Sequence, residues 1–309
     1  MQRTSTPAQP TRLAARRTST GPIIVASDGA PASAGAFGVA RLLAERSEAE
    51  VHVVSALAEP NVVVPPMDSP ATLVRPGATR VEERRAELDL LARATAVEAT
   101  RWPVEIVLGD PIPSIVQVAA ERDVPLVVTG HTHHGMVERL VRRETPLGIM
   151  RAARVPVLAV PPAMTHLPHV VVVAVELGDA GARLSNVAGA LFSDAVAVHL
   201  VHVREPALPR HERLLRAEEE ADDRAAERAF DRARDGWRLP ADVSTVTNVL
   251  AGRPAEELQG FARSVGADLI VVGLTVPAHA PPLPHRSLAI RLYREWPLAL
   301  LLVPIGGLE

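Results

Sequence analysis

The chain of 309 residues is long for one α/β domain and suits two domains of roughly 150 residues each. Its hydrophobic content is 47% but its aromatic content only 3%, so the core must be built mainly from Val, Leu, Ile and Ala. The absence of cysteine excludes disulfides, thiolate metal ligands and cysteine nucleophiles. Because every basic residue is arginine, Schiff-base chemistry and a lysine-dependent phosphate loop are also excluded.

Residues 1–20 carry four arginines and no acidic residue, and they lack the apolar run of a signal peptide. We predict a disordered tail there, with a transit peptide as the less favoured alternative. A net charge of −3 provides no general attraction to nucleic acid, and no run reaches the ~18 apolar residues that a bilayer span needs. We therefore expect a soluble, cytoplasmic protein with neither a nucleic-acid nor a membrane partner.

The first half of the chain alternates short apolar runs with longer helical stretches, which predicts a parallel sheet. The runs are rich in valine rather than alternating with polar residues, as is typical of strands covered on both faces. Five strands are predicted, at residues 23–28, 51–57, 104–108, 124–129 and 155–160.

The second half repeats the first. Two pairs of segments are separated by 143 residues, namely VLGDP at 107–111 with LAGRP at 250–254, and PLVVTG at 125–130 with DLIVVG at 268–273. A repeat of this length indicates two copies of one architecture. The predicted organisation is a tail at 1–20, domain 1 at 21–162, a proline-rich linker at 163–169 and domain 2 at 170–305.

The connections 58–103 and 204–242 are each predicted to contain one helix. In the second connection, Glu212 to Arg234 carries an alanine at every fourth position, at 221, 225, 229 and 233. This spacing predicts an apolar stripe facing the core, with the charged residues on a solvated face.

In an open parallel sheet, a ligand binds at the carboxyl ends of the strands where the strand order reverses. For five strands in the order 3-2-1-4-5, that point lies between strands one and four. It is marked by Asp28 and Gly130 in the first half and by Glu176 and Gly273 in the second.

The segments VASDG at 25–29, GDP at 109–111, VVTG at 127–130 and PVLAV at 156–160, with their repeats, resemble the universal stress protein family in order and spacing. The resemblance covers nearly the whole chain. It implies two flavodoxin-like (adenine nucleotide alpha hydrolase-like) domains, each a five-stranded parallel sheet of order 3-2-1-4-5 with helices on both faces. It also implies that the domains pair through their fifth strands, at 155–160 and 298–303.

One branch of that family binds ATP through a glycine, two residues, a second glycine, nine residues and then Gly-Ser or Gly-Thr. This chain keeps the spacing but has His133 and Arg143-Glu144 after Gly130, and Val276 and Arg286-Ser287 after Gly273. A side chain where backbone must approach a phosphate keeps that phosphate away, and Glu144 adds repulsion. The arginines could still bind an anion, although they are equally well explained as solvated residues at a helix start.

The resemblance aligns Asp28 with the family's adenine-contacting acid, and Glu176 is one methylene longer. A strand-end acid can instead cap the following helix. The candidate ligand residues are Asp28, Gly130, His133 and Arg143 in the first crevice and, with a weaker fit, Glu176, Gly273, Arg286 and Ser287 in the second.

No catalytic residues and no metal site are predicted. Adjacent histidines such as those at 131–134 rarely converge on one ion, and no Gly-x-Ser-x-Gly elbow is present. His52, His199 and His202 alternate with apolar residues on the second strands, which favours hydrogen-bonded core histidines.

The expected function is that of a stress-response regulatory protein acting through a protein partner, with weakened or lost ATP binding and no enzyme activity. The alternative is a switch that binds an adenine nucleotide through Asp28, Gly130 and Arg143, and the least favoured is an enzyme acting on a nucleotide or small anion. No cofactor is expected, apart from ATP or another adenine nucleotide in the alternative. A monomer and a homodimer both remain open.

Overall fold

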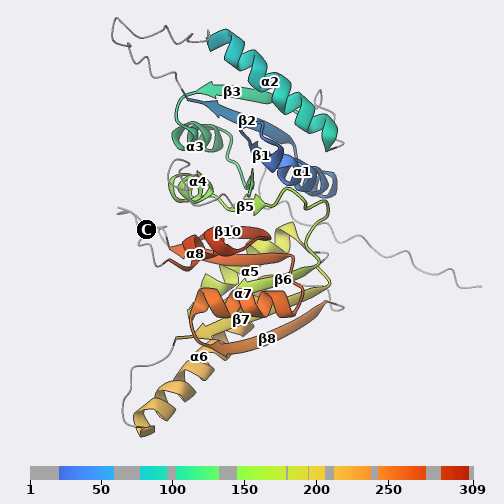
Figure 1. Ribbon diagram of the computed structural model, residues 1–309. Coiled ribbons are helices and arrows are strands. Elements are labelled where there is room, and N and C mark those ends of the chain that lie inside the picture. Colours follow the sequence, from blue (N-terminus) through green and yellow to red (C-terminus); the bar gives the residue numbers. More distant parts are fainter. Residues whose placement is uncertain are drawn as a thin grey trace, which may run out of the picture.

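The valine-rich runs form ten strands that join into one mixed sheet in the computed structural model (Figure 1). The structure describes residues 21–58, 77–95, 102–131, 145–178, 180–193, 195–205, 212–237, 243–275 and 287–305. The predicted tail at 1–20 lies outside these residues.

The first half has the predicted alternation of strands and helices, and several strands begin or end a few residues inside the predicted ranges. Its elements are β1 (Ile23–Ala26), η1 (Pro31–Ser33), α1 (Ala34–Ser47), β2 (Val51–Leu57), α2 (Gly77–Ala94), β3 (Val104–Leu108), α3 (Pro111–Glu121), β4 (Val127–Gly130), α4 (Thr145–Ala153) and β5 (Val157–Val160).

The second half repeats this series with longer strands. Its elements are β6 (Val170–Ala174), α5 (Ala180–Leu191), β7 (Ala197–Arg204), α6 (Glu212–Trp237), β8 (Ser244–Ala251), α7 (Pro254–Ser264), β9 (Leu269–Thr275), α8 (Leu288–Glu295) and β10 (Ala299–Ile305).

The strand order is β3-β2-β1-β4-β5-β10-β9-β6-β7-β8. Within each half all neighbours are parallel and follow the predicted order 3-2-1-4-5. The halves join where β5 pairs antiparallel with β10, with Leu158 opposite Leu301. Pairing through the fifth strands is thus confirmed, and all strand carboxyl ends of one half lie on one edge of its part of the sheet.

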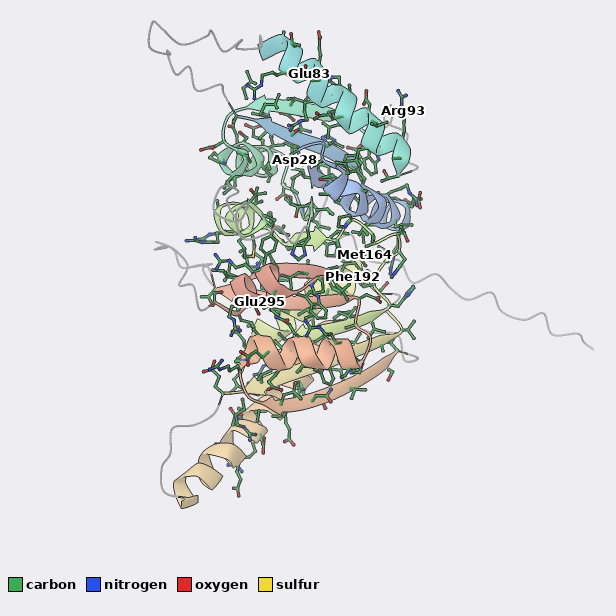
Figure 2. All side chains as sticks on the ribbon, viewed as in Figure 1. Asp28, Glu83, Arg93, Met164, Phe192 and Glu295 are labelled. Carbon is green, nitrogen blue, oxygen red and sulfur yellow. The ribbon has the colours of Figure 1, made fainter. Side chains whose placement is uncertain are left out.

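Two helical layers sandwich the sheet across both halves. Helices α1, α2, α5 and α6 pack on one face, and α3, α4, α7 and α8 pack on the other. The first layer includes Met164 from the interdomain segment between β5 and β6, which is buried in the same apolar cluster as Phe192 of the second half (Figure 2). The apolar core therefore runs without a break past the junction between the halves.

The predicted apolar stripe on α6 is confirmed at Ala229 and Ala233 and wrong at Ala221. Ala226, Ala229, Ala233 and Trp237 are buried, whereas Ala221 is exposed. The buried residues follow the 3.6-residue period of the helix, and a spacing of four drifts off that face. The amino-terminal part of α6 projects beyond the sheet (Figure 1).

Side chains also bridge the halves on both faces. Buried His131 of the first half stacks on Tyr293 with ring centroids 4.8 Å apart, and its Nε2 lies 2.8 Å from the Tyr293 carbonyl oxygen. On the other face, Arg46 donates to the hydroxyl of Ser193. These polar contacts reinforce the register that the β5–β10 pair sets.

Histidines on β2 and β7 differ in their partners. His202 is buried and its Nδ1 lies 3.0 Å from the Val175 carbonyl oxygen, as expected of a hydrogen-bonded core histidine. His52 accepts a hydrogen bond from Arg122 through Nδ1. His199 packs edge-on against Phe261 with centroids 5.4 Å apart, and its buried Nδ1 has no hydrogen-bond partner among the described residues.

Stability should therefore fall when the solution is acidified. Burial lowers the pKa of His199 below its ordinary value of 6.5, and burial together with Arg122 does the same for His52. Between the folded and unfolded pKa values the unfolded chain binds more protons, so stability present above pH 6.5 is lost as the pH falls. We expect urea unfolding to shift to lower urea from about pH 7 to about pH 5.5, and His199→Leu to reduce that shift. An unchanged shift in His199→Leu would exclude His199 as a cause.

No described helix is both long enough and apolar enough to pass through a membrane.

Candidate functional site

The loop after β1 carries the first predicted ligand residue. Gly29 has a φ of 76°, a left-handed conformation that favours glycine. The hydroxyl of Ser27 accepts a hydrogen bond from the Gly29 amide at 3.0 Å, and Asp28 Oδ1 accepts one from the Ala30 amide at 3.1 Å. Asp28 is exposed at the carboxyl edge of the sheet (Figure 2). The loop therefore presents the carboxylate to solvent at the predicted switch point.

Gly130 ends β4 beside this loop. A Cβ atom at Gly130 would lie 2.8 Å from the Ala32 carbonyl oxygen and 3.0 Å from the Ser33 Cα, so only glycine lets the loop cross the strand end this closely. The preceding Thr129 is buried, and its hydroxyl has no hydrogen-bond partner among the described residues. β1 and β4 pair in register, so Asp28 and Gly130 share the edge that the sequence predicts.

Helix α2 flanks the first crevice with a polar cluster that sequence reasoning missed. Arg84 donates to the buried hydroxyl of Ser55 at 2.9 Å and to Glu87 Oε2 at 3.0 Å. A Cβ atom at Gly29 would lie 2.9 Å from the Glu87 Cβ, so α2 reaches the loop after β1. The only sequence signal was a serine within an apolar strand. The cluster places an arginine and a glutamate beside the Asp28 loop.

Side chains, rather than mainly backbone atoms as at Gly130, lie against Gly273 at the second crevice. A Cβ atom at Gly273 would lie 2.7 Å from Ile305 Cδ1 and 3.3 Å from Leu184 Cδ1. Ile305 and Leu184 are both buried. The space beside the backbone of Gly273 is therefore occupied by apolar side chains, which cannot form hydrogen bonds with a phosphate.

Acidic residues accumulate at the ends of β6 and β7. Burial by surrounding protein raises the pKa of the Glu176 carboxyl although the residue retains solvent contact, and His202 opposes that rise. His202 Nε2 lies 3.5 Å from Asp222 Oδ2 on α6, and Arg204 pairs with Asp222 at 2.9 Å. In the repeat, His202 occupies the position of Ser55. In the second half the helix supplies the acid Asp222 and the strand supplies the bases His202 and Arg204, whereas in the first half the helix supplies Arg84 and the strand supplies the uncharged Ser55.

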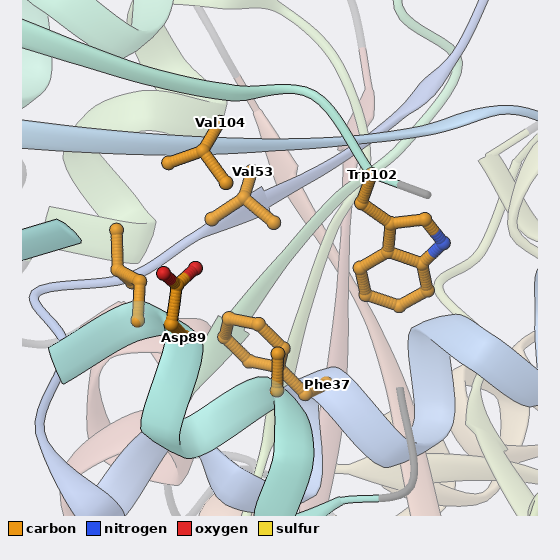
Figure 3. Close-up of a pocket in the computed structure, with 7 residues that line it drawn as sticks. Phe37, Val53, Asp89, Trp102 and Val104 are labelled. Atoms are coloured by element: carbon orange, nitrogen blue, oxygen red, sulfur yellow. The ribbon is translucent and has the colours of Figure 1, made fainter. Parts of the chain in front are cut away.

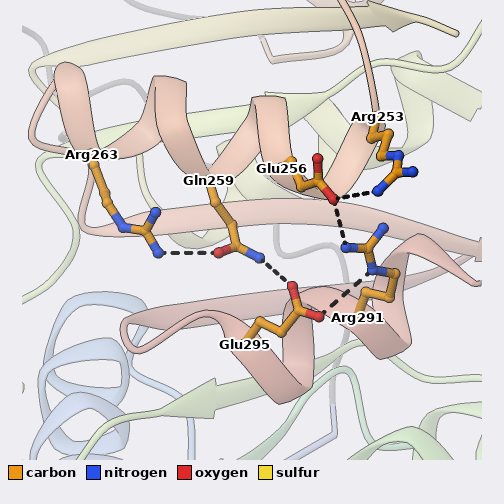
Figure 4. A network of polar contacts seen from close by, with 6 residues as sticks. All are labelled: Arg253, Glu256, Gln259, Arg263, Arg291 and Glu295. Atoms are coloured by element: carbon orange, nitrogen blue, oxygen red, sulfur yellow. Dashed lines mark hydrogen bonds and ion pairs between the residues drawn. The ribbon is translucent and has the colours of Figure 1, made fainter.

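The start of α8 holds the last described candidate. Ser287 is the residue before the helix, and its hydroxyl makes no capping hydrogen bond. Arg291 in the first turn lies 3.4 Å from Glu256 Oε1 and 3.7 Å from Glu295 Oε1 (Figure 4). Arg253 donates to Glu256 at 3.2 Å, and its hydrogen bond, with that of Arg291, lowers the pKa of Glu256. Carboxylates therefore offset the positive charge that an anion would need at this helix start.

The remaining candidates, His133, Arg143 and Arg286, lie outside the described residues. Neighbouring His131 is buried against Tyr293 of the other half, so its side chain takes part in the contact between the halves. The described part of the structure therefore brings Asp28 and Gly130 to one edge of the first half. The pairing of β6 with β9 likewise brings Glu176 and Gly273 to one edge of the second half, where apolar side chains pack against Gly273.

A small cavity in the first half lies away from this edge. It is bounded by α1, α2 and the sheet and has room for about one water molecule. Its lining is mostly apolar, with Asp89 directed toward it, and consists of Phe37, Val53, Leu88, Asp89, Ala92, Trp102 and Val104 (Figure 3). A cavity of this size is a packing defect and not a ligand pocket.

Each half is doubly wound, with its strand order reversing between its first and fourth strands. Two such halves define a tandem protein of nucleotide-binding-like, Rossmann-like architecture. The sequence profile described as "Universal stress protein family" matches residues 20–161 and again residues 169–303. The chain therefore belongs to the universal stress protein family, as a tandem member.

Solved structures show the same tandem fold. A universal stress protein from Archaeoglobus fulgidus DSM 4304 is similar at 15% identity and a TM-score of 0.61, over 94% of this chain and 98% of that one. A functionally unknown protein from Pseudomonas aeruginosa PAO1 is similar at 14% identity and a TM-score of 0.58, over 92% of each chain. No curated protein matches the chain significantly.

Proposed function

We propose that this universal stress protein is a cytoplasmic regulatory protein of the stress response that acts by contacting a protein partner. In this proposal ATP binding is weakened or lost and the chain is not an enzyme. The filled space beside Gly273 carries the proposal, because the apolar side chains of Ile305 and Leu184 pack against this backbone and offer a phosphate no hydrogen-bond donor.

The charges of the second half support the same conclusion. Glu176 and Asp222 are acidic groups beside the second crevice, and Glu256 and Glu295, the last residue of α8, both pair with Arg291 in the first turn of that helix. Arg204 and Arg291 are each engaged by a carboxylate at 3.7 Å or less, and Arg232 donates to the Gly178 carbonyl oxygen at 2.8 Å. A triphosphate entering this half would meet repulsion without an unengaged cation to offset it among these residues.

The alternative function is an adenine-nucleotide switch confined to the first half. The exposed carboxylate of Asp28 and the close backbone approach at Gly130 favour it, because both features stand at one edge. In that case Arg143 would hold the phosphates by its side chain and the second half would be structural.

Equilibrium calorimetry with ATP, ADP and AMP distinguishes these functions. We expect no binding of micromolar affinity to the wild-type protein. Asp28→Ala is the informative variant, and Glu176→Ala is the matched control from the second crevice. Micromolar ATP binding that Asp28→Ala abolishes and Glu176→Ala leaves unchanged would replace our proposal with the nucleotide switch.

A further inference from the structure

Three side chains suited to binding a metal ion converge where the interdomain segment enters β6. They are His166, His169 and Asp268, and one candidate ligand atom from each lies within 4.8 Å of the others. His169 directly precedes β6 and Asp268 directly precedes β9. The cluster therefore lies at the amino-terminal edge of these parallel strands, opposite the edge that carries the crevices.

Hydrogen bonds hold two of these residues in place. Asp268 Oδ2 accepts bonds from the backbone amides of His169 at 2.9 Å and Val170 at 3.0 Å. The His169 carbonyl accepts bonds from the amides of Val196 at 2.7 Å and Ala197 at 3.2 Å. The carboxylate and the backbone of His169 are thus positioned without a metal, which reduces the ordering that binding would require.

The orientation of His166 fits a metal ligand. Its Nδ1 lies 2.9 Å from the Leu167 carbonyl oxygen, and an N–H must donate in that bond. Nε2 then carries the lone pair that binds a metal, and metal-ligating histidines usually donate their other ring nitrogen in this way. The His166 and His169 rings are nearly parallel, at 7° with centroids 5.1 Å apart, and both residues are exposed.

We propose that His166, His169 and Asp268 form a binding site for a divalent transition-metal ion of the zinc class, with water completing the coordination. Two imidazoles and one carboxylate are ligands that zinc accepts, and hard cations such as Mg²⁺ prefer oxygen alone. Tetrahedral bonds of about 2.0–2.1 Å place ligand atoms about 3.4 Å apart. The candidate ligand atoms lie within 4.8 Å of one another, so rotations of the two exposed imidazoles that bring these atoms closer by up to about 1.4 Å close the site.

The sequence did not indicate this site, because Asp268 is far along the chain from His169 and meets it only through the pairing of β6 with β9. A bound ion would fasten the interdomain segment to the second half. Since the site lies on the edge opposite Asp28, metal binding should not depend on a nucleotide.

Calorimetric titration of chelator-treated, untagged, full-length protein with ZnCl₂ tests the site. We expect one zinc ion per chain, with MgCl₂ giving no heat of binding. His166→Asn and His169→Asn should each weaken zinc affinity by at least about tenfold. Asp268→Asn retains an oxygen that can accept the bonds from the two amides but removes the negative charge, and it should weaken zinc affinity to a similar extent. Circular dichroism checks that this variant folds. If it does not fold, the two histidine variants alone test the site.

The double variant His133→Asn/His134→Asn is the matched control, because it removes two histidines elsewhere and should retain zinc binding. The proposal is overturned if the wild-type protein binds no zinc, if the His166 and His169 variants bind as the wild type does, or if the control variant loses binding.

Discussion

Replacing Leu301 with alanine should lower the free energy of unfolding by about 2–5 kcal/mol. Leu301 is fully buried in β10, opposite Leu158 of β5 and beside Val271 of β9. Truncation removes apolar contacts from both halves at once and leaves a cavity in a sheet that is held by strands on either side. Urea unfolding followed by circular dichroism measures the loss.

Leu298→Ala is the matched control, because Leu298 immediately precedes β10 and is 39% exposed. Its substitution should change stability by no more than about 0.5 kcal/mol. Equal effects of the two substitutions would show that the seam contributes little to stability.

The same seam predicts that both halves unfold together. Trp102 packs on Phe37 in the first half, with ring centroids 6.0 Å apart, whereas Trp237 and Trp296 are buried in the second. Variants that keep Trp102 alone, or only the second-half tryptophans, should therefore give coincident urea transitions by fluorescence. Two separated transitions would instead mean that the β5–β10 pair does not couple the halves.

The sheet could be predicted from sequence because its signals are local and repeated. Valine-rich runs bounded by glycine or proline mark each strand, and the repeat places Gly109 and Gly252 at the same point of each half. In the structure both glycines have positive φ, at 142° and 149°. Strand order then follows from the family resemblance, because local patterns alone do not specify which strands are neighbours.

The side-chain contacts at the strand ends could not be predicted from the sequence in the same way. Ile305 reaches Gly273 from the last strand, and Arg84 reaches Ser55 from a helix whose register the sequence does not specify. The exposure of Ala221 and the burial of Ala226 on α6 have the same origin, since packing against α5 selects the buried face. Contacts between elements depend on rotations and translations that no single segment encodes.

The two halves differ in chemistry at the carboxyl ends of their second strands. Ser55 of the first half is replaced by His202, and the uncharged Leu57 by Arg204, which pairs with Asp222. The strands that carry these residues keep their register and order. The fold therefore tolerates a change of crevice chemistry because the core lies in the layers above and below the sheet, away from the strand ends.

Replacing Gly35 with alanine should lower the free energy of unfolding by at least about 2 kcal/mol, although alanine is the better helix former. The new Cβ would lie 2.0 Å from the Pro161 carbonyl oxygen, 3.0 Å from its carbon and 3.1 Å from Val160 Cγ1. Two of these neighbours are backbone atoms, so a side-chain rotation cannot relieve the contact, and α1 or the end of β5 must move.

Gly38→Ala, one turn further along α1, separates this clash from helix propensity. The nearest atom to its Cβ is the Met164 carbonyl oxygen at 3.9 Å, so that substitution should be accommodated and should stabilise the chain by about 0.5–1 kcal/mol. Urea unfolding of both variants should therefore show shifts of opposite sign. If Gly35→Ala were as stable as Gly38→Ala, α1 could not approach the end of β5 as closely as the structure places it. The anchoring of the interdomain segment at Pro161, from which the chain leads to Met164 and on to the His166–His169–Asp268 cluster, would then need revision.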